Sequence, residues 1–198
     1  DGEIFDASFE PSMDRDVLCF EGPWNTLIPQ QGEEIREHER VAAARAFTTP
    51  KGELVIDFGQ EVTGYVETVL DGHAGEILDL SFAEVMDKEG NFYTENYRRA
   101  KAQYRYICRD GHQVYKPRLT FWGFRYIRVN RFPGGPEKAG AECFTAVAVH
   151  SAMKRTGHLS CSNRNLNRLF DNIIWGQKGN FLDVPTDCPQ RDERLGWT

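Results

Sequence analysis

The chain lacks a long apolar segment and an excess of positive charge. No stretch approaches the roughly 20 consecutive apolar residues that a membrane-spanning helix needs, and the opening residues DGEIFD have neither the basic nor the apolar part of a secretory signal. The 198 residues carry a formal net charge of -6. Such a chain has no basic field for a nucleic acid backbone or an anionic membrane, so we expect neither as a partner. A neutral substrate is favoured.

Paired cysteines are also lacking. The five cysteines are odd in number and widely spaced, and no two form a CxxC pair. This pattern does not fit a zinc site or a complete disulfide framework, so we predict no metal and no cofactor. Reduced thiols, together with the missing signal pattern, slightly favour a cytoplasmic location.

Alternating apolar residues dominate the middle of the chain. Turn sequences such as DGHAG (71–75) and PGG (133–135) separate short segments in which every second residue is apolar. The alternating sets are Leu54, Ile56 and Phe58; Leu78, Leu80 and Phe82; Tyr104, Tyr106 and Cys108; Phe124 and Tyr126; and Phe144, Ala146 and Ala148. Alternation without intervening helices is typical of an antiparallel β-sandwich or jelly roll. We predict a mainly β protein with one β domain over residues 51–150.

Residues 1–50 show little alternation. They contain four prolines and a charged run at 33–40, EEIREHER. Prolines are poorly tolerated inside a sheet, and a run of charge is usually a solvated surface. We therefore interpret this region as the end of a preceding β domain, a linker and an entering strand.

After residue 157 the apolar period becomes helical. The stripe runs to about Asn180, and Ser162 is the predicted N-cap. The stripe consists of Leu166, Leu169, Phe170, Ile173 and Ile174. A helix with such a face must bury it against other helices. We therefore predict that residues 151–198 begin a helical domain that the chain cuts short.

The last thirteen residues, TDCPQRDERLGWT (186–198), combine three carboxylates with two arginines. Glycoside hydrolysis needs one protonated carboxyl group to donate to the leaving oxygen and one carboxylate that acts on water or on the anomeric carbon. Asp187, Asp192 and Glu193 are the candidates. Neighbouring carboxylates raise a carboxyl pKa and arginines lower it, so spacing alone does not identify the acid. On composition alone, the alternative is a solvated turn anchored by Trp197.

This terminal segment is similar, almost letter for letter, to the signature that opens the catalytic domain of glycoside hydrolase family 78, the bacterial and fungal α-L-rhamnosidases. Upstream segments resemble the β-sandwich that precedes the catalytic barrel in this family. They are IDFGQEVTGYV (56–66), GHAG (72–75), FAE (82–84), NYRRA (96–100) and GFRY (123–126). The resemblance covers roughly residues 50–198. It implies a concanavalin-like jelly roll followed by the start of an (α/α)6 barrel.

The resemblance also implies a reaction and its residues. The family removes terminal non-reducing α-L-rhamnose from rhamnosylated glycosides or polysaccharides by an inverting mechanism. By this resemblance Glu193 is the general acid, Asp187 and Arg191 bind the rhamnose hydroxyls, and Trp197 lines the sugar pocket. The general base is a glutamate beyond Thr198, so we expect this chain alone to be inactive.

Two departures from the family pattern lie in the sandwich. Glu61 stands where the family usually has Asn, and Ala102-Gln103 stand where a Thr-Asp pair is common. We interpret both as differences of packing or subfamily.

Two arginines of the sandwich, Arg98 and Arg125, are predicted to be structural. Isolated strand arginines usually serve packing and ion pairs. We expect them to pair with Asp57 or Glu84 between strands.

Two non-catalytic roles compete with the enzyme hypothesis. A sandwich can bind glycans through exposed aromatics, here Trp24, Trp122 or Tyr93, and burial of Trp122 would argue against this role. Alternatively, the sandwich supports the barrel and shields one rim of its active site without a ligand of its own.

Overall fold

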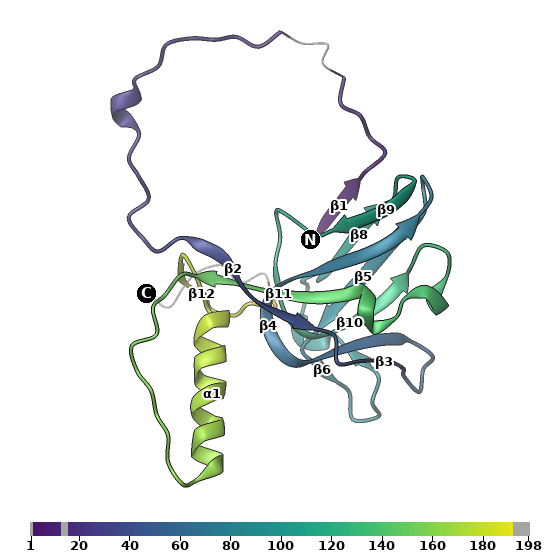
Figure 1. Ribbon diagram of the computed structural model, residues 1–198, viewed down its shortest axis with the longest axis vertical. Coiled ribbons are helices and arrows are strands. Elements are labelled where there is room, and N and C mark those ends of the chain that lie inside the picture. Colours follow the sequence, from purple (N-terminus) through teal and green to yellow (C-terminus); the bar gives the residue numbers. More distant parts are fainter. Residues whose placement is uncertain (1, 13–15, 192–198) are drawn as a thin grey trace.

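The computed structural model describes residues 2–12 and 16–191, which form a curled β-sheet with an α-helix beside it (Figure 1). The predicted class, mainly β followed by a helix, is confirmed. No helix in the described part is both long and apolar enough to cross a membrane. The elements are β1 (Glu3–Asp6), η1 (Trp24–Thr26), β2 (Ile35–Ala42), β3 (Arg45–Thr48), β4 (Leu54–Gly72), β5 (Ile77–Ala83), β6 (Val85–Met86), β7 (Phe92–Tyr93), η2 (Glu95–Tyr97), β8 (Gln103–Ile107), β9 (Gly111–Tyr115), β10 (Trp122–Arg131), η3 (Pro136–Lys138), η4 (Ala141–Cys143), β11 (Phe144–Ser151), α1 (Arg164–Gly179), β12 (Phe181–Leu182) and β13 (Val184–Pro185).

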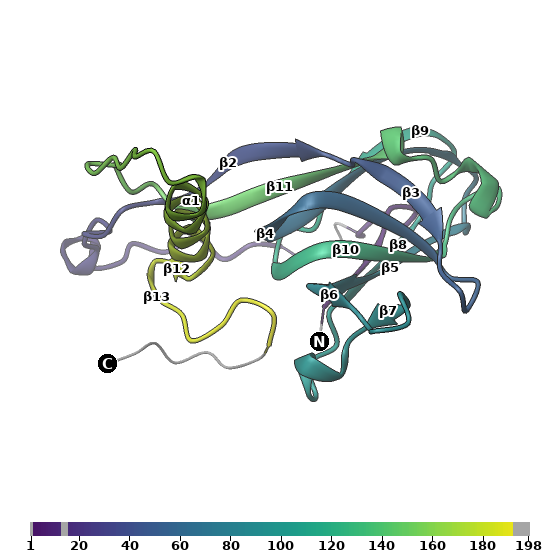
Figure 2. The same cartoon turned by 90° about the horizontal axis from the view of Figure 1, so that it is seen from below.

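The sheet is built around the 19-residue strand β4. Its order is β1-β8-β5-β10-β4-β11-β2, and β3 and β9 also pair with β4. All of these pairings are antiparallel except β1 with β8. Because β4 changes partners along its length, the sheet bends over itself (Figure 2). Strands from the first 50 residues, β1, β2 and β3, belong to this sheet.

A continuous aromatic core fills the bend. The Phe82 ring stacks on Trp122 with centroids 4.2 Å apart, and its edge contact with Phe124 has a centroid distance of 4.9 Å. The alternating positions of β5, β8 and β11 all point into this core, as predicted from their period of two. The sequence pattern therefore identifies the buried face of these strands correctly.

Strand β10 departs from strict alternation. Phe124 and Tyr126 were predicted to share one face, but Phe124 is in the main core and Tyr126 packs against a second cluster containing Val55 and Phe92. The register between β10 and β4 shifts between residues 124 and 126. A bulge inserts an extra residue into one strand and redirects the side chain that follows, which is why the alternation fails here.

Helix α1 starts one residue later than predicted. Its N-cap is Asn163, whose side-chain oxygen accepts hydrogen bonds from the N–H groups of Asn165 and Leu166. The prediction of Ser162 as the N-cap was therefore wrong. Both residue types can cap a helix, and the backbone path settles which one does.

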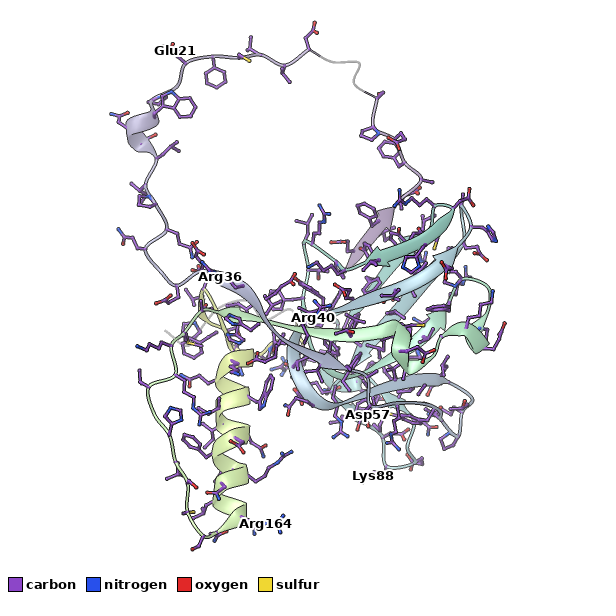
Figure 3. The ribbon with its side chains drawn as sticks, in the orientation of Figure 1. Glu21, Arg36, Arg40, Asp57, Lys88 and Arg164 are labelled. Carbon is purple, nitrogen blue, oxygen red and sulfur yellow. The ribbon has the colours of Figure 1, made fainter. Side chains whose placement is uncertain are left out.

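One face of α1 contacts the sheet, and the predicted apolar stripe lies on another. Trp175 packs against the sandwich core, and Lys178 pairs with Glu39 of β2. Leu166, Leu169 and Ile173 are 49%, 53% and 56% exposed. The start of the helix at Arg164 lies far from the sheet (Figure 3). The helix is thus attached at its C-terminal half.

The described residues between β1 and β2, 7–12 and 16–34, follow a wide arc away from the sheet (Figure 1). Figure 3 places Glu21 on the outer part of this arc. Its described residues include several exposed apolar side chains: Val17, Leu18, Phe20, Trp24, Leu27 and Ile28. Among the described residues of this stretch, Ala7 packs against the main core, whereas these six exposed side chains do not belong to it.

Candidate functional site

The segment after α1 returns to the sandwich through a small hairpin. Strands β12 and β13 pair around Asp183, which has a left-handed φ of 69°. The Asp183 N–H donates to Ser151 Oγ at 2.8 Å, and Leu182 is only 8% exposed. The hairpin therefore holds the start of the segment against β11. Pro185 and Pro189 keep this segment non-helical, because proline lacks a backbone N–H and disrupts a helix.

The segment brings two of the predicted sugar-binding residues together. Arg191 Nη2 lies 3.7 Å from Asp187 Oδ2, and Arg191 Nε donates to Cys188 Sγ at 3.1 Å. The two side chains are partly accessible, at 32% for Asp187 and 18% for Arg191. A carboxylate that accepts beside a guanidinium that donates can bind two neighbouring hydroxyl groups. Glu193 and Trp197 lie outside the described residues.

Residues 188–190 lie between two grooves, each of about 880 Å³. One lies between α1 and the sheet and is lined by Glu61, Glu84, Arg125, Trp175 and Asp187, among others. The other is lined by Tyr65, Lys101, Arg118, Trp122, Leu182 and Arg191, among others. Cys188, Pro189 and Gln190 border both. The segment is therefore accessible from two sides.

Two buried side-chain oxygens of the segment have no partner among residues 2–12 and 16–191. Thr186 Oγ1 and Gln190 Oε1 find no hydrogen bond among the described residues. Buried polar atoms are normally paired, so these atoms are available to a polyol or to water. Among residues 2–12 and 16–191, no group of three or more His, Cys, Asp or Glu side chains is arranged to hold a metal ion.

A carboxyl pair lies in the wall of the first groove. Asn96 Nδ2 donates to Glu84 Oε2 at 2.9 Å. Burial, followed by the charge and hydrogen bond of Glu61, raises the pKa of Glu84 to about 8, although Asn96 and Arg191 act in the opposite direction. This environment therefore favours the protonated form of Glu84.

The sequence alone does not predict the proximity of Glu61 and Glu84. Glu61 was interpreted as a packing difference, whereas it lines the groove beside the terminal segment. The departure from the family's usual Asn was the available signal, because it places a second carboxylate near Glu84. The spatial neighbour could not be identified from spacing, since 23 positions separate the two glutamates along the chain.

The prediction for Arg125 is confirmed. Its Nε and Nη2 atoms donate to the two carboxylate oxygens of Asp57 at 2.9 and 3.1 Å. Burial acts to raise the Asp57 pKa, but hydrogen bonds from Arg125 and from the Gly59 N–H lower it overall. Arg125 is therefore engaged between strands. The pairing of Arg98 stays a prediction.

The aromatics considered for glycan binding are differently placed. Trp122 is 5% exposed and lies in the core, Tyr93 is half-buried and Trp24 is 71% exposed. The burial of Trp122 argues against a binding face built on this residue.

Both parts of the chain match known domain families. Residues 47–150 match the bacterial alpha-L-rhamnosidase concanavalin-like domain. Residues 154–198 match the bacterial alpha-L-rhamnosidase six-hairpin glycosidase domain. The boundary between the matches falls between the end of β11 and the start of α1.

Curated relatives and solved structures are similar to this chain over most or all of its length. The chain is 40% identical to an alpha-L-rhamnosidase of Streptomyces avermitilis over all of this chain and 20% of that protein. The crystal structure of an Aspergillus terreus α-L-rhamnosidase superposes with a TM-score of 0.82 at 37% identity, covering 90% of this chain and 21% of the other. A Streptomyces avermitilis α-L-rhamnosidase complexed with L-rhamnose gives 0.80 at 39% identity, covering 87% and 16%.

These similarities assign both regions of the chain to the same enzyme family. The sandwich and the terminal segment match the same enzymes in the same order. The chain spans about a fifth of the length of its Streptomyces avermitilis relative. It belongs to the α-L-rhamnosidases of glycoside hydrolase family 78, of which it carries the concanavalin-like domain and the opening of the six-hairpin glycosidase domain.

Proposed function

We propose that this chain is part of an enzyme that removes terminal non-reducing α-L-rhamnose from a glycoside or polysaccharide by inversion. The proposal rests on the arrangement of Asp187 beside Arg191 at the edge of two grooves. One side chain accepts and the other donates, which suits the neighbouring hydroxyls of a neutral sugar. The relative that was crystallised with L-rhamnose supports this sugar as the ligand.

In this proposal Glu193 protonates the leaving oxygen. It follows Arg191 by two positions, so it continues the same segment. Inversion also needs a second carboxylate about 6.5–9.5 Å away, with room for the attacking water. The proposal places that general base outside this chain. Trp197 supplies an apolar face that stacks on the sugar ring.

The exposed stripe of α1 supports a larger helical domain around this site. Leu166, Leu169 and Ile173 lie on one side of the helix and are about half exposed. An apolar helical face is normally buried against other elements. We propose that further helices of the six-hairpin domain cover it and complete the sugar pocket.

Substituting the acid in the longer enzyme tests the proposal. Glu193→Gln keeps the shape but removes the proton donor, so hydrolysis of α-L-rhamnosides with poor leaving groups should fall by about 10²–10⁴-fold. Aryl substrates with good leaving groups should lose less, since they need less protonation. Steady-state kinetics over a leaving-group series measures this difference, and proton NMR of the first-formed anomer reports inversion.

The matched control is Asp183→Asn. Asp183 is exposed in the β12–β13 turn, and this change also neutralises one carboxylate. Its activity should equal that of the unchanged enzyme. Equal activity of the Glu193→Gln variant would remove Glu193 as the acid. Turnover by the 198-residue chain alone, abolished by the same change, would contradict an external general base.

A further inference from the structure

A strand of the sandwich directly contacts the sugar-binding segment. The Gly123 N–H in β10 donates to the Pro189 carbonyl oxygen at 2.9 Å. Gly123 is buried between the core residues Trp122 and Phe124. A rigid sheet position is therefore tied to the middle of the segment.

The contact requires a glycine at position 123 because of Pro189. A Cβ at residue 123 would lie 2.7 Å from Pro189 Cγ and 3.1 Å from Pro189 Cβ. The φ of Gly123 is outside the left-handed region, so its backbone conformation suits any residue. The space, and not the backbone angle, excludes a larger side chain here.

The other side of Gly123 is fixed by a buried tyrosine. Tyr97 Oη donates to the Gly123 carbonyl oxygen at 2.8 Å, and Tyr97 is 1% exposed. Burial and the nearby carboxylates raise the pKa of Tyr97 above its ordinary value, so the phenol retains the proton that it donates. The residues Tyr97, Gly123 and Pro189 thus form one connected path from η2 to the terminal segment.

Pro189 lies midway between Asp187 and Arg191, two residues from each. We propose that Gly123 is a positioning residue for sugar binding, which seats Pro189 against β10 and thereby sets the spacing of the Asp187 and Arg191 side chains. The inference rests on the proposed function. It assigns to the sandwich a direct part in shaping the rhamnose site of the neighbouring domain.

Gly123→Ala in the longer enzyme tests this role. The added methyl group displaces Pro189, so kcat/KM should fall by about 10- to 100-fold, mainly through a higher KM, because both sugar-binding side chains move. Gly157→Ala is the matched control. Residue 157 also has a φ outside the left-handed region, and its Cβ would meet nothing within 4 Å. This control should leave KM and kcat unchanged.

A double-mutant cycle separates positioning from a general loss of stability. Pro189→Ala removes the Cγ atom that the new methyl group meets, so the KM effect of Gly123→Ala should be several-fold smaller in the Pro189→Ala background. An equal effect in both backgrounds would overturn the proposal. So would a lower thermal midpoint of Gly123→Ala with an unchanged KM.

The failure of this inference differs from the failure of the proposed function. If the unchanged enzyme does not hydrolyse aryl α-L-rhamnosides, or if Glu193→Gln has no effect, the proposed function is wrong. If the unchanged enzyme is active, Glu193→Gln slows hydrolysis of substrates with poor leaving groups and Gly123→Ala has the KM of Gly157→Ala, only the positioning role is wrong.

Discussion

The sandwich and the region that follows it are stabilised in different ways. The sandwich buries Phe82, Phe124 and Ile127 completely, at 0% exposure. Helix α1 has no buried residue, and its apolar stripe is about half exposed. One region completes its core from its own strands. The other depends on contacts with the sandwich and leaves an apolar face uncovered in this chain.

This difference suggests separate contributions of the two regions to the proposed site: the sandwich supports the segment, and the segment carries the polar side chains. Trp122, Phe124 and Ile127 anchor β10 in the aromatic core, and the Gly123 N–H of the same strand donates to the Pro189 carbonyl oxygen of the terminal segment. Precise placement of binding groups requires such rigid support. Under the proposed function, the sugar-binding side chains belong to the region that lacks a core of its own, and the sandwich positions them.

Truncating one apolar residue in each region should give the largest contrast. Phe82→Ala removes a fully buried ring from the sandwich and should lower the free energy of unfolding by about 3–5 kcal/mol. Ile173→Ala, on the exposed stripe of α1, should change it by less than about 0.5–1 kcal/mol. Urea unfolding of this chain measures both values. Similar losses for the two variants would remove the distinction between the regions.

A smaller effect is expected where α1 meets the sandwich. Trp175 packs against the core, and the Lys178 ammonium group lies 4.7 Å from its ring centroid. Trp175→Ala should lower the opening free energy of the helix by about 2 kcal/mol, because part of a large side chain leaves the interface.

Amide hydrogen exchange resolves this local effect. Exchange in α1 should become about 30-fold faster while β5 and β10 keep their protection. Leu169→Ala, on the same helix but 53% exposed, is the control and should leave both regions unchanged. Equal acceleration in the helix and the sheet would show that the two regions open together.

The smallest effect concerns pH at the boundary between the regions. The pKa of Glu84 is raised to about 8 by burial and by Glu61, so the folded chain binds a proton that the unfolded chain releases at lower pH. Stability must then fall as pH rises from about 4.3, the ordinary value for glutamate, to about 8. Glu84→Gln should reduce this fall.

Denaturant unfolding at pH 5 and pH 8 compares the two slopes. Carboxyl groups with lowered pKa values, such as Asp57 and Glu53, change stability below this range, so they do not mask the effect. Carbon-13 NMR of the Glu84 carboxyl group gives an independent reading, and Glu61→Gln should move its pKa downward. An identical pH dependence of the Glu84→Gln variant would contradict the raised pKa of Glu84.

Periodicity predicted the sandwich well because burial repeats regularly along strands. Leu78, Leu80 and Phe82 are all fully buried, as their spacing indicates. It failed at Tyr126, where a bulge changes the face, and at Ser162, where two adjacent residues could both cap the helix. These details depend on local backbone geometry, which residue types specify weakly.

Contacts across domains were harder to predict than elements. The sequence placed Gly123 in a recognisable segment but gave no reason for its presence. The reason is the Pro189 ring, 66 positions later in the chain. Glu61 and Glu84 likewise lie close together only because the sheet curls. Motifs indicate which residues matter, whereas tertiary structure decides what they touch.

The long strand β4 also has a consequence for how the protein folds. Its partners extend from residue 45 in β3 to residue 148 in β11, so its hydrogen bonds join positions far apart in sequence. Pairing of distant strands slows folding, because the entropy of closing large loops is lost before the contacts form. During synthesis β4 acquires its last partner only when β11 has been made, just before the catalytic domain begins. The sheet that contacts residues 186–191 is therefore complete shortly before those residues are synthesised.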